Sequence, residues 1–254
     1  MNERDIYWKQ TKIYNPKTDQ QPKIHIYGAG SIGSWTTLCL AKTGFTDITI
    51  YDYDQVEEDN IPARFYMPIE GSRKELKINA LYDEVYNFTN IKIEKVNGKI
   101  TKDTELDIKI HTIHILALDN IETRKIIIEK LKGYPVYIID GRIGGTTWEL
   151  YSFKGSDTED LKEYQETLKR KMTDEECGNK TSCPINMIIA GKITAEVLKI
   201  STYKNQSKQQ LGNIWEVEEL GDINRMWIKS KDYDYEEGVW AITDSPEGDE
   251  NDEN

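Results

Sequence analysis

Cysteines and long apolar runs are both scarce in this sequence. Its 254 residues include three cysteines, too few for the disulfide framework of a small secreted protein. No apolar run reaches the roughly 18 residues that cross a bilayer. The first residues are charged and contain no hydrophobic stretch, so we expect neither a membrane span nor a secretion signal. These absences favour a cytoplasmic protein.

Positive charge is also in short supply. Lysine and arginine total 33 against 45 aspartate and glutamate residues, which gives a net charge of −12 and an isoelectric point near 4.9. Because nucleic-acid binding normally needs a basic surface, we expect no nucleic-acid partner. Part of the acidic excess lies in residues 243–254 (TDSPEGDENDEN), which have almost nothing to bury and predict a solvated, disordered tail.

Candidates for metal or triad chemistry are few. The three histidines, His25, His111 and His114, all fall on expected strands, where a partnered position in or beside the sheet is the ordinary state. Structural zinc needs four ligands, commonly as two close pairs. Cys177 and Cys183 have neither a second pair nor a histidine near them in the sequence, so we expect no structural zinc.

What the sequence does contain is a regular alternation of strand and helix patterns. The expected strands are 23–27, 47–51, 91–96, 111–116, 136–139 and 147–153, and the expected helices are 34–42, 72–86, 121–131, 157–172 and 184–201. Because parallel strands need helical crossovers, this alternation predicts an α/β fold with a doubly wound, mostly parallel, Rossmann-like sheet and helices on both faces. A hairpin is expected around Trp227 and Trp240.

The first strong motif is Gly28-Ala-Gly30-Ser-Ile-Gly33, which follows a strand pattern and opens a helix pattern. Glycines there allow a tight turn and let backbone amides approach a polyphosphate at the positive end of the helix. Asp52, at the end of the second strand, stands where a ribose-binding carboxylate is expected. The pattern predicts nucleotide binding without separating ATP from NAD.

Four further motifs follow in order along the chain. They are Asp52-Tyr-Asp54-Gln-Val56, then Asn60-Ile61 with Arg64, then Lys77-Ile-Asn-Ala-Leu81, and finally Asp119-Asn120 with Arg124. On these motifs, residues 23–200 resemble the ThiF/MoeB/HesA family, relatives of the ubiquitin-activating enzymes. The resemblance implies an adenylyltransferase that uses ATP and Mg²⁺.

The resemblance also implies roles for particular residues. Arg64 and Lys77 would act in catalysis by contacting the phosphates, and Asp119 would act as the Mg²⁺ ligand. Asp52 would bind the ribose. The rest of the implied nucleotide-binding set is Gly28, Gly30, Gly33, Asp54, Asn60 and Asn120. Such a set fits the chemistry, because a carboxylate that attacks the α-phosphorus of ATP needs cations to neutralise the polyphosphate.

Three features depart from the family pattern. Asn60 and Arg64 are four residues apart, where the family usually has three. Lys74 is an alternative to Lys77, because Gly71-Ser-Arg-Lys74 also matches a Gly-x-x-Lys pattern, although the following Ile-Asn-Ala-Leu favours Lys77. The early arginine segment that reaches across the dimer in many relatives has no counterpart here. The resemblance implies a homodimer, and whether a partner subunit completes the site stays open.

The segment from about residue 173 to residue 184 corresponds to the family's crossover loop. In many relatives a cysteine of this loop accepts the acyl group. Cys177 is the first candidate, Cys183 is the second, and the third alternative is that no cysteine is catalytic. A thiolate there would attack the acyl-adenylate. The expected division of the chain is a lead-in (1–22), an ATP-binding adenylation domain (23–204), a small C-terminal extension (205–242) and the acidic tail (243–254).

The implied substrate is the C-terminal carboxylate of a ubiquitin-like or sulfur-carrier protein, or of a peptide. A modified tRNA base is the less attractive option because of the acidic charge. Two alternatives of other kinds remain. One is a non-catalytic pseudo-enzyme that serves as a partner subunit, and the other is an NAD-dependent oxidoreductase built on the same glycine loop.

Overall fold

The computed structural model describes residues 6–145, 147–169, 182–202, 217–222, 227–233 and 240–242, and the structural statements below concern these residues. Asn60 is described only as backbone. The predicted acidic tail and Cys177 lie outside the described residues. No helix in the described ranges has the length and apolar character needed to cross a membrane.

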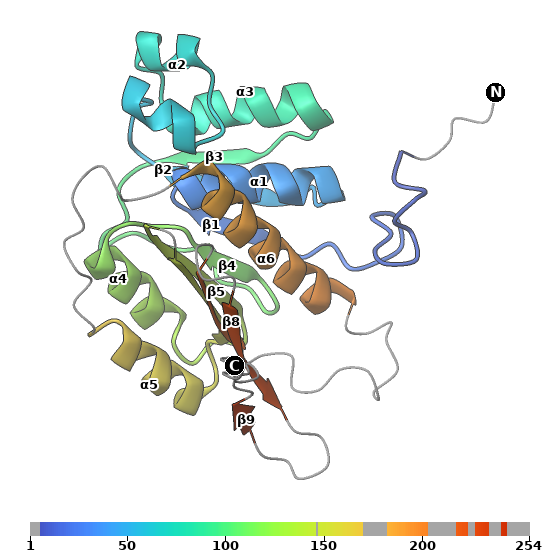
Figure 1. The fold of residues 1–254 in the computed structure, drawn as a ribbon, viewed down its shortest axis with the longest axis vertical. Helices are drawn as coiled ribbons and strands as arrows, with labels where there is room; N and C mark the ends of the chain where they lie inside the picture. The colour runs from blue at the N-terminus through green and yellow to red at the C-terminus, as the bar shows by residue number, and fades with distance from the viewer. Residues whose placement is uncertain are drawn as a thin grey trace, which may run out of the picture.

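A sheet of nine strands in the described residues forms the centre of the molecule (Figure 1). Its order is β3-β2-β1-β4-β5-β6-β7-β8-β9. The strands are β1 (Ile24–Tyr27), β2 (Ile48–Asp52), β3 (Glu94–Asn97), β4 (Ile113–Leu116), β5 (Tyr137–Gly144), β6 (Thr147–Lys154), β7 (Val217–Asp222), β8 (Trp227–Tyr233) and β9 (Trp240–Ile242). The first five of these strands pair in parallel, and the strands from β6 onward pair antiparallel.

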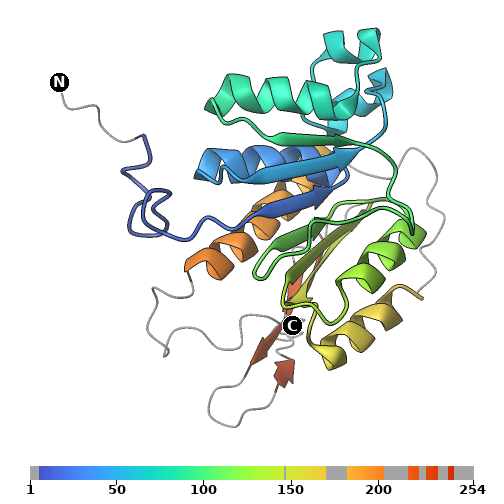
Figure 2. The ribbon, with the colours of Figure 1, turned by 180° about the vertical axis from the view of Figure 1, so that it is seen from behind.

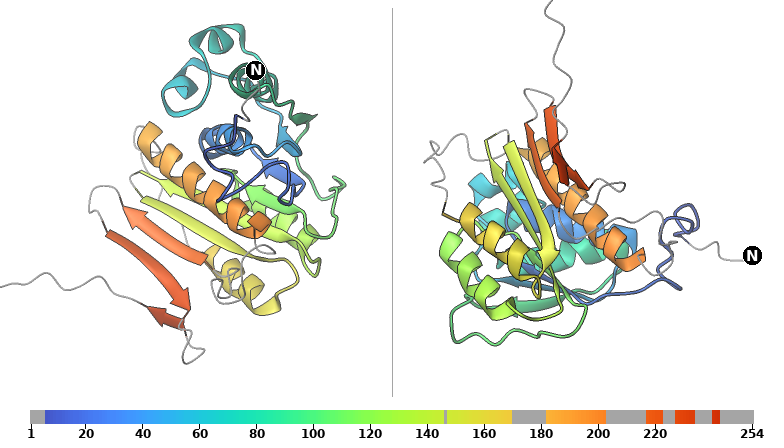
Figure 3. Two further views of the ribbon diagram at one scale, coloured as in Figure 1. Left: turned by 90° about the vertical axis from the view of Figure 1, so that its right-hand side faces the viewer. Right: turned by 90° about the horizontal axis from the view of Figure 1, so that it is seen from below.

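Helices cover both faces of the sheet (Figure 3). One face carries α1 (Ser31–Thr43), α3 (Lys77–Thr89) and α6 (Cys183–Thr202), and the other carries α4 (Ile121–Leu131) and α5 (Thr158–Thr167). Alternate residues of the central strands feed the two cores: Ile24 and Ile26 pack under α1, whereas Tyr27 packs with the residues of α4 and α5. The predicted doubly wound, Rossmann-like fold is confirmed.

One predicted helix is divided in two. The expected helix 72–86 is replaced by α2 (Pro68–Arg73) and α3, which begins at Lys77. Lys74 ends α2 with φ 50° in the left-handed region, and its backbone N–H closes the helix onto the carbonyls of Glu70 and Gly71. A short 3₁₀ helix, η1 (Glu58–Ala63), precedes α2. The chain therefore turns twice between β2 and α3, which brings Lys77 back to the end of β2.

Two other regions contain more β-strand than the sequence pattern predicted. β5 continues past the predicted end at residue 139 to Gly144, because it pairs with β6 along its whole length from Tyr137↔Lys154 to Gly144↔Thr147. In the predicted C-terminal extension, β7 pairs with β6, and β8 pairs with β9 as the expected hairpin. These strands continue the same sheet.

The lead-in packs against the far end of α1. Tyr14 is fully buried and stacks on Phe45 with ring centroids 4.6 Å apart. The side-chain amide of Gln10 donates to the carbonyl of Thr43 at 2.7 Å. Residues 6–22 thus cover the C-terminal end of α1, opposite the end that begins at the glycine loop.

A row of buried polar rings lies on the sheet face away from α1. His25 and His114 stack with centroids 4.9 Å apart on the neighbouring strands β1 and β4. The hydroxyl of Tyr27 and the Nδ1 of His114 are 2.9 Å apart, and Thr112 Oγ1 is 2.9 Å from its Nε2. Both histidines therefore have partners within the sheet, as the sequence predicted. His111, which was also predicted on a strand, lies instead in a turn before β4, with φ 66° and an exposed side chain.

Candidate functional site

The predicted site residues come from segments that end at one edge of the sheet. β1, β2 and β4 run parallel and stop at Tyr27, Asp52 and Leu116. β2 lies on one side of β1 and β4 on the other, so the chain changes direction between β1 and β4. In open α/β sheets a ligand crevice forms at such a switch, outside the carboxyl ends of the strands.

The glycine loop is built on two close backbone approaches. Gly28 has φ 102°, and a Cβ added to it would lie 2.4 Å from the carbonyl oxygen of Ala117 at the end of β4. A Cβ on Gly33 would lie 1.8 Å from the carbonyl oxygen of Gly28. Only glycine fits at either position. The first turn of α1 consequently packs directly on the end of β1.

Gly30 plays a different part, because nothing lies within 4 Å of the Cβ it lacks. It is the N-cap of α1, and no side chain caps the helix there. The first N–H groups of a helix have no partner within the helix. The open space above Gly30 and the uncapped start of α1 fit the phosphates of a nucleotide.

Asp52 holds the glycine loop in place from the end of β2. Its Oδ2 accepts a hydrogen bond from the backbone N–H of Ala29 at 2.7 Å, and its Oδ1 accepts from that of Asp54 at 2.8 Å. The carboxylate is half-buried. Both contacts orient Asp52 beside the loop, where the sequence predicted a ribose-binding group.

Arg64 follows directly on η1, and the residues on either side of it are fixed against α1. The indole N–H of Trp35 donates to the carbonyl of Ala63 at 3.2 Å, and the backbone N–H of Phe65 donates to Ser34 Oγ at 3.2 Å. Arg64 itself is half-buried. These bonds place it alongside the first turns of α1.

Two more contacts tie this segment to the glycine loop and to α6. The hydroxyl of Tyr66 donates to the carbonyl of Ala29, and the side-chain amide of Asn186 in α6 donates to the carbonyl of Ala63 at 2.7 Å. Sequence reasoning did not identify Tyr66 or Asn186. Neither residue forms a local pattern, because both partners are distant in the sequence.

Lys77 is the first residue of α3, and it is buried. Its Nζ lies 2.7 Å from Oδ2 of Asp54, and the lysine side chain is 8% exposed against 48% for the aspartate. Lys74, the alternative, is exposed at the far end of α2. Of the two lysines, Lys77 is the one held at the end of β2.

Asp119 and Asn120 follow β4 at the same edge. Asp119 is exposed, and Asn120 is the N-cap of α4, where its Oδ1 accepts from the backbone N–H of Thr123 at 2.9 Å. The cap fixes the turn that presents Asp119. The nucleotide contact expected for Asn120 stays a prediction.

The acidic residues of this edge lie close enough to Tyr53 to raise the pKa of its hydroxyl group. Tyr53 is exposed, and the charge of Asp54, slight burial, and the charges of Asp119 and Asp52 together raise its pKa. Asp119 therefore lies within electrostatic range of the β2 end. Its single carboxylate suits Mg²⁺, which proteins commonly hold through one or two carboxylates and substrate phosphates. Within the described ranges, no three histidine, cysteine, aspartate or glutamate side chains gather as a metal cluster.

Arg124 of the Asp-Asn-x-x-x-Arg motif points into the protein. It is 3% exposed, and its Nε donates to Oδ1 of the fully buried Asp140 at 3.0 Å. Asp140 Oδ2 also accepts from Arg142 at 2.7 Å and from the Tyr164 hydroxyl at 2.8 Å. Asp140 thereby joins α4, β5 and α5, and it anchors the helix whose first turn follows Asp119.

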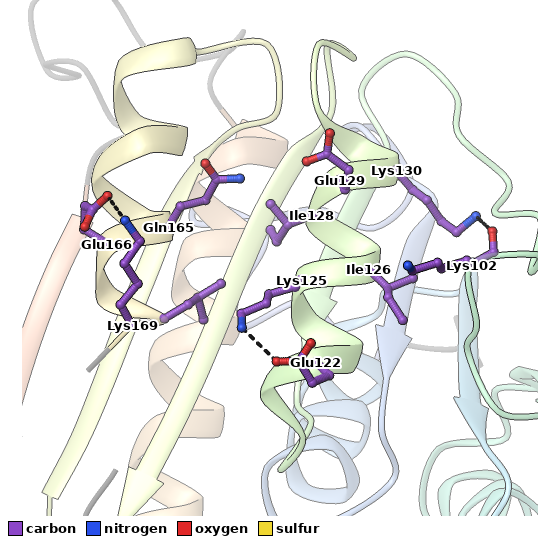
Figure 4. Close-up of a pocket in the computed structure, with 11 residues that line it drawn as sticks. Lys102, Glu122, Lys125, Ile126, Ile128, Glu129, Lys130, Gln165, Glu166 and Lys169 are labelled. Atoms are coloured by element: carbon purple, nitrogen blue, oxygen red, sulfur yellow. Dashed lines mark hydrogen bonds and ion pairs between the residues drawn. The ribbon is translucent and has the colours of Figure 1, made fainter. Parts of the chain in front are cut away.

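The described residues on either side of the predicted crossover loop lie against different elements. Lys169, just after α5, lines one groove with Lys125 in the first turns of α4 (Figure 4). Cys183 begins α6, whose first turn contacts Ala63 through Asn186. Cys183 is a half-buried free thiol.

The groove between α4 and α5 has a volume of about 650 Å³. Four of its charged side chains form two ion pairs: Lys125 lies 2.7 Å from Glu122, and Lys169 lies 2.6 Å from Glu166 (Figure 4). It is lined by the helices of the face opposite α1 and includes none of the predicted site residues. The groove therefore contains none of the residues predicted to bind the nucleotide.

The fold and this edge together define a class of protein. A doubly wound sheet with a glycine loop, an uncapped helix start and a carboxylate at the end of the second strand is a nucleotide-binding domain of the Rossmann-like class. Residues 13–234 match the ThiF family, and the chain belongs to that family.

Similar proteins have the same fold. The crystal structure of PaaA superimposes with a TM-score of 0.62 and 19% identity, covering 85% of this chain and 74% of that chain. Escherichia coli MccB, crystallised with ATP, gives a TM-score of 0.62 and 16% identity over 85% of this chain and 64% of MccB. Ubiquitin-like modifier-activating enzyme 5 of Caenorhabditis elegans is 24% identical over 104 residues, which are 41% of this chain and 21% of the relative. The chain therefore spans about a fifth of that relative's length.

Proposed function

We propose that the protein is an ATP- and Mg²⁺-dependent adenylyltransferase that activates the C-terminal carboxylate of a ubiquitin-like or sulfur-carrier protein or of a peptide. One observation supports the proposal: in a ThiF-family chain, the glycine loop, Asp52, Arg64, Lys77 and Asp119 belong to separate segments that lie at one edge of the sheet. Hydride transfer would need no such set of cations and carboxylates.

The proposed reaction is acyl-adenylate formation. A substrate carboxylate oxygen attacks the α-phosphorus of ATP, the bond to the bridging oxygen breaks, and pyrophosphate leaves. The open start of α1 would bind the polyphosphate, while Arg64 and Lys77 would balance its charge. Mg²⁺ held at Asp119 would neutralise further charge on the phosphates. The residues contribute mainly positioning and electrostatics.

The substrate class is supported by what similar proteins bind. Escherichia coli MccB was crystallised with AMPCPP and MccA, and the similar protein of Caenorhabditis elegans is named as an activating enzyme for a ubiquitin-like modifier. Both names support a peptide or small-protein carboxylate as the substrate here. A homodimer is part of the proposal, and light scattering of the purified chain tests it.

A thioester step would follow adenylation. The thiolate of Cys177 or Cys183 would attack the acyl carbon, and AMP would leave as the acyl group passes to sulfur. The position of Cys183 at the start of α6, next to the segment that carries Arg64, supports a thiol near the site. Acyl transfer that survives Cys177→Ala and Cys183→Ala would remove this step from the proposal.

Radiolabelled pyrophosphate exchange into ATP tests the central claim. With Mg²⁺ and candidate carrier proteins or peptides, exchange should depend on the carrier and fall at least about 100-fold in Asp119→Ala. The exposed Asp103, outside the site, supplies the control Asp103→Ala, which should exchange at the wild-type rate. ATP binding with no exchange for any carrier would favour the non-catalytic pseudo-enzyme. Binding of NAD in place of ATP would overturn the proposal.

A further inference from the structure

The ion pair between Lys77 and Asp54 brings a buried cation to the proposed site. Lys77 Nζ and Asp54 Oδ2 are 2.7 Å apart, and the lysine side chain is 8% exposed. An ammonium group that is removed from water needs a counter-charge and fixed hydrogen bonds. Asp54 supplies the counter-charge and one hydrogen bond, while its own side chain is still 48% exposed.

The backbone fixes the same pair a second time. The N–H of Lys77 donates to the carbonyl of Asp54 at 2.9 Å, and the N–H of Val56 donates to the carbonyl of Glu75 at 2.7 Å. Between these bonds, Gln55 and Leu76 form an antiparallel bridge. These contacts hold the segment after β2 against the first turn of α3. The backbone position of Lys77, from which its side chain extends, is therefore fixed.

The two aspartates of the Asp52-Tyr-Asp54 motif have separate partners. Asp52 accepts from the N–H groups of Ala29 and Asp54, so it acts on the glycine loop. Asp54 contacts Lys77 instead. We propose that Asp54 is a positioning residue, which directs Lys77 to the polyphosphate and does not bind the nucleotide itself. The inference rests on the proposed function, because it takes ATP as the ligand.

A double-mutant cycle on ATP affinity tests this role in the full-length chain. Calorimetry with Mg²⁺ and ATP, without carrier, measures binding in the wild type, Asp54→Asn, Lys77→Met and the double variant. We expect about a tenfold loss in each single variant. We expect no loss beyond that of Lys77→Met in the double variant, because Asp54 acts through the lysine.

Adenosine supplies the second readout. A residue that acts through a phosphate-binding lysine should leave adenosine affinity unchanged in Asp54→Asn, whereas a ribose ligand would weaken adenosine and ATP by the same factor. Asp54→Glu, which keeps the charge, should recover part of the ATP affinity. Lys74→Met, which removes the exposed lysine of the same segment, is the matched control and should bind ATP like the wild type.

The outcomes separate this inference from the proposed function. If Asp54→Asn lowers the ATP affinity by the same factor in the wild type and in the Lys77→Met variant, Asp54 contacts the nucleotide directly. That result would overturn this inference and leave the proposed function standing. Unchanged ATP affinity in Asp54→Asn would also overturn the inference. A wild-type chain that binds no ATP would overturn the proposed function, and this inference with it. Thermal unfolding of each variant without nucleotide shows whether an effect reflects loss of the fold.

Discussion

At the scale of single residues, the glycine loop is governed by how much room each glycine has. Gly28 and Gly33 sit where an added Cβ would meet backbone oxygen at 2.4 and 1.8 Å, whereas Gly30 has open space. A backbone oxygen in a packed region cannot move aside for an added Cβ as the end of a flexible side chain can. The same motif therefore contains two packing glycines and one that leaves space for a ligand.

Gly33→Ala should lower the free energy of unfolding and remove nucleotide binding together. The added methyl group would push the first turn of α1 away from Gly28, at a cost of about 1–3 kcal/mol. Urea unfolding and ATP calorimetry measure the two effects.

Gly30→Ala is the matched change in the same loop. Its methyl group meets no neighbouring atom, so the unfolding free energy should change by at most about 1 kcal/mol, from the poorer helix N-cap. Equal destabilisation by the two substitutions would contradict the packing account of Gly33.

The sequence pattern identified single site candidates such as Asp52 and Lys77 more readily than the residues that contact them. The position of Asp52 follows from its distance along a βαβ unit, and the structure places it beside the loop. Nothing local indicates that Lys77 is buried against Asp54, because the pair forms only when the chain turns back through η1 and α2. Tyr66 was missed for the same reason: its hydroxyl contacts Ala29 across 37 residues.

At the scale of elements, α4 is anchored through one buried ion pair. Arg124, 3% exposed, contacts the fully buried Asp140 of β5, and Asn120 caps the helix at its start. The turn that carries Asp119 is therefore fixed from both sides. Its position therefore depends on a buried residue outside the predicted nucleotide-binding set.

Arg124→Met should destabilise the protein strongly. It removes one partner of a buried pair, for which a loss of about 3–5 kcal/mol is typical. Arg142 and Tyr164 still contact Asp140, so the lower part of that range is expected. The measurement is the unfolding free energy from urea denaturation.

Lys125→Met is the matched variant one residue along the same helix. Lys125 pairs with Glu122 on the surface, with side chains 48% and 77% exposed, so the loss should stay below about 1 kcal/mol. If both substitutions cost the same, the buried pair does not anchor α4.

Two helices show where the sequence pattern predicts helix boundaries correctly and where it does not. The structure places α4 at the predicted residues 121–131, because Asn120 is a local capping signal and the helix is periodic. The predicted helix 72–86 is interrupted because Lys74 adopts a left-handed conformation. That conformation is rare outside glycine and asparagine, and no pattern in the sequence marks it.

At the scale of the whole molecule, the buried histidine pair links stability to pH. Burial, followed by the nearby charge of Lys23, lowers the pKa of His25 to about 4, and burial with the neighbouring His25 lowers that of His114 to about 3. An unfolded histidine has a pKa of about 6.5. Between these values the unfolded chain binds protons that the folded chain does not, so stability decreases as pH falls from about 6.5 to 4.

The loss over this range should be on the order of 3 kcal/mol for each histidine, at about 1.4 kcal/mol per pKa unit. His25→Phe keeps an aromatic ring against His114 and removes one of the two groups, so the decrease in unfolding free energy between pH 7 and pH 4 should shrink by the share of one histidine. His111→Asn leaves both buried rings in place and should keep the wild-type pH dependence. A His25→Phe curve that follows the wild type would show that carboxylates alone set the slope.

The β3 edge of the sheet has a consequence for solubility. β3 is the outer strand on the parallel side of the sheet (Figure 2). It is four residues long, exposed throughout, and carries Glu94 and Lys95. Lys95 also lies over the ring of Tyr82, 4.5 Å from its centroid. A short, charged strand is a poor template for a strand of another molecule. The open parallel sheet can therefore end in solvent without joining neighbouring molecules into fibres through this edge.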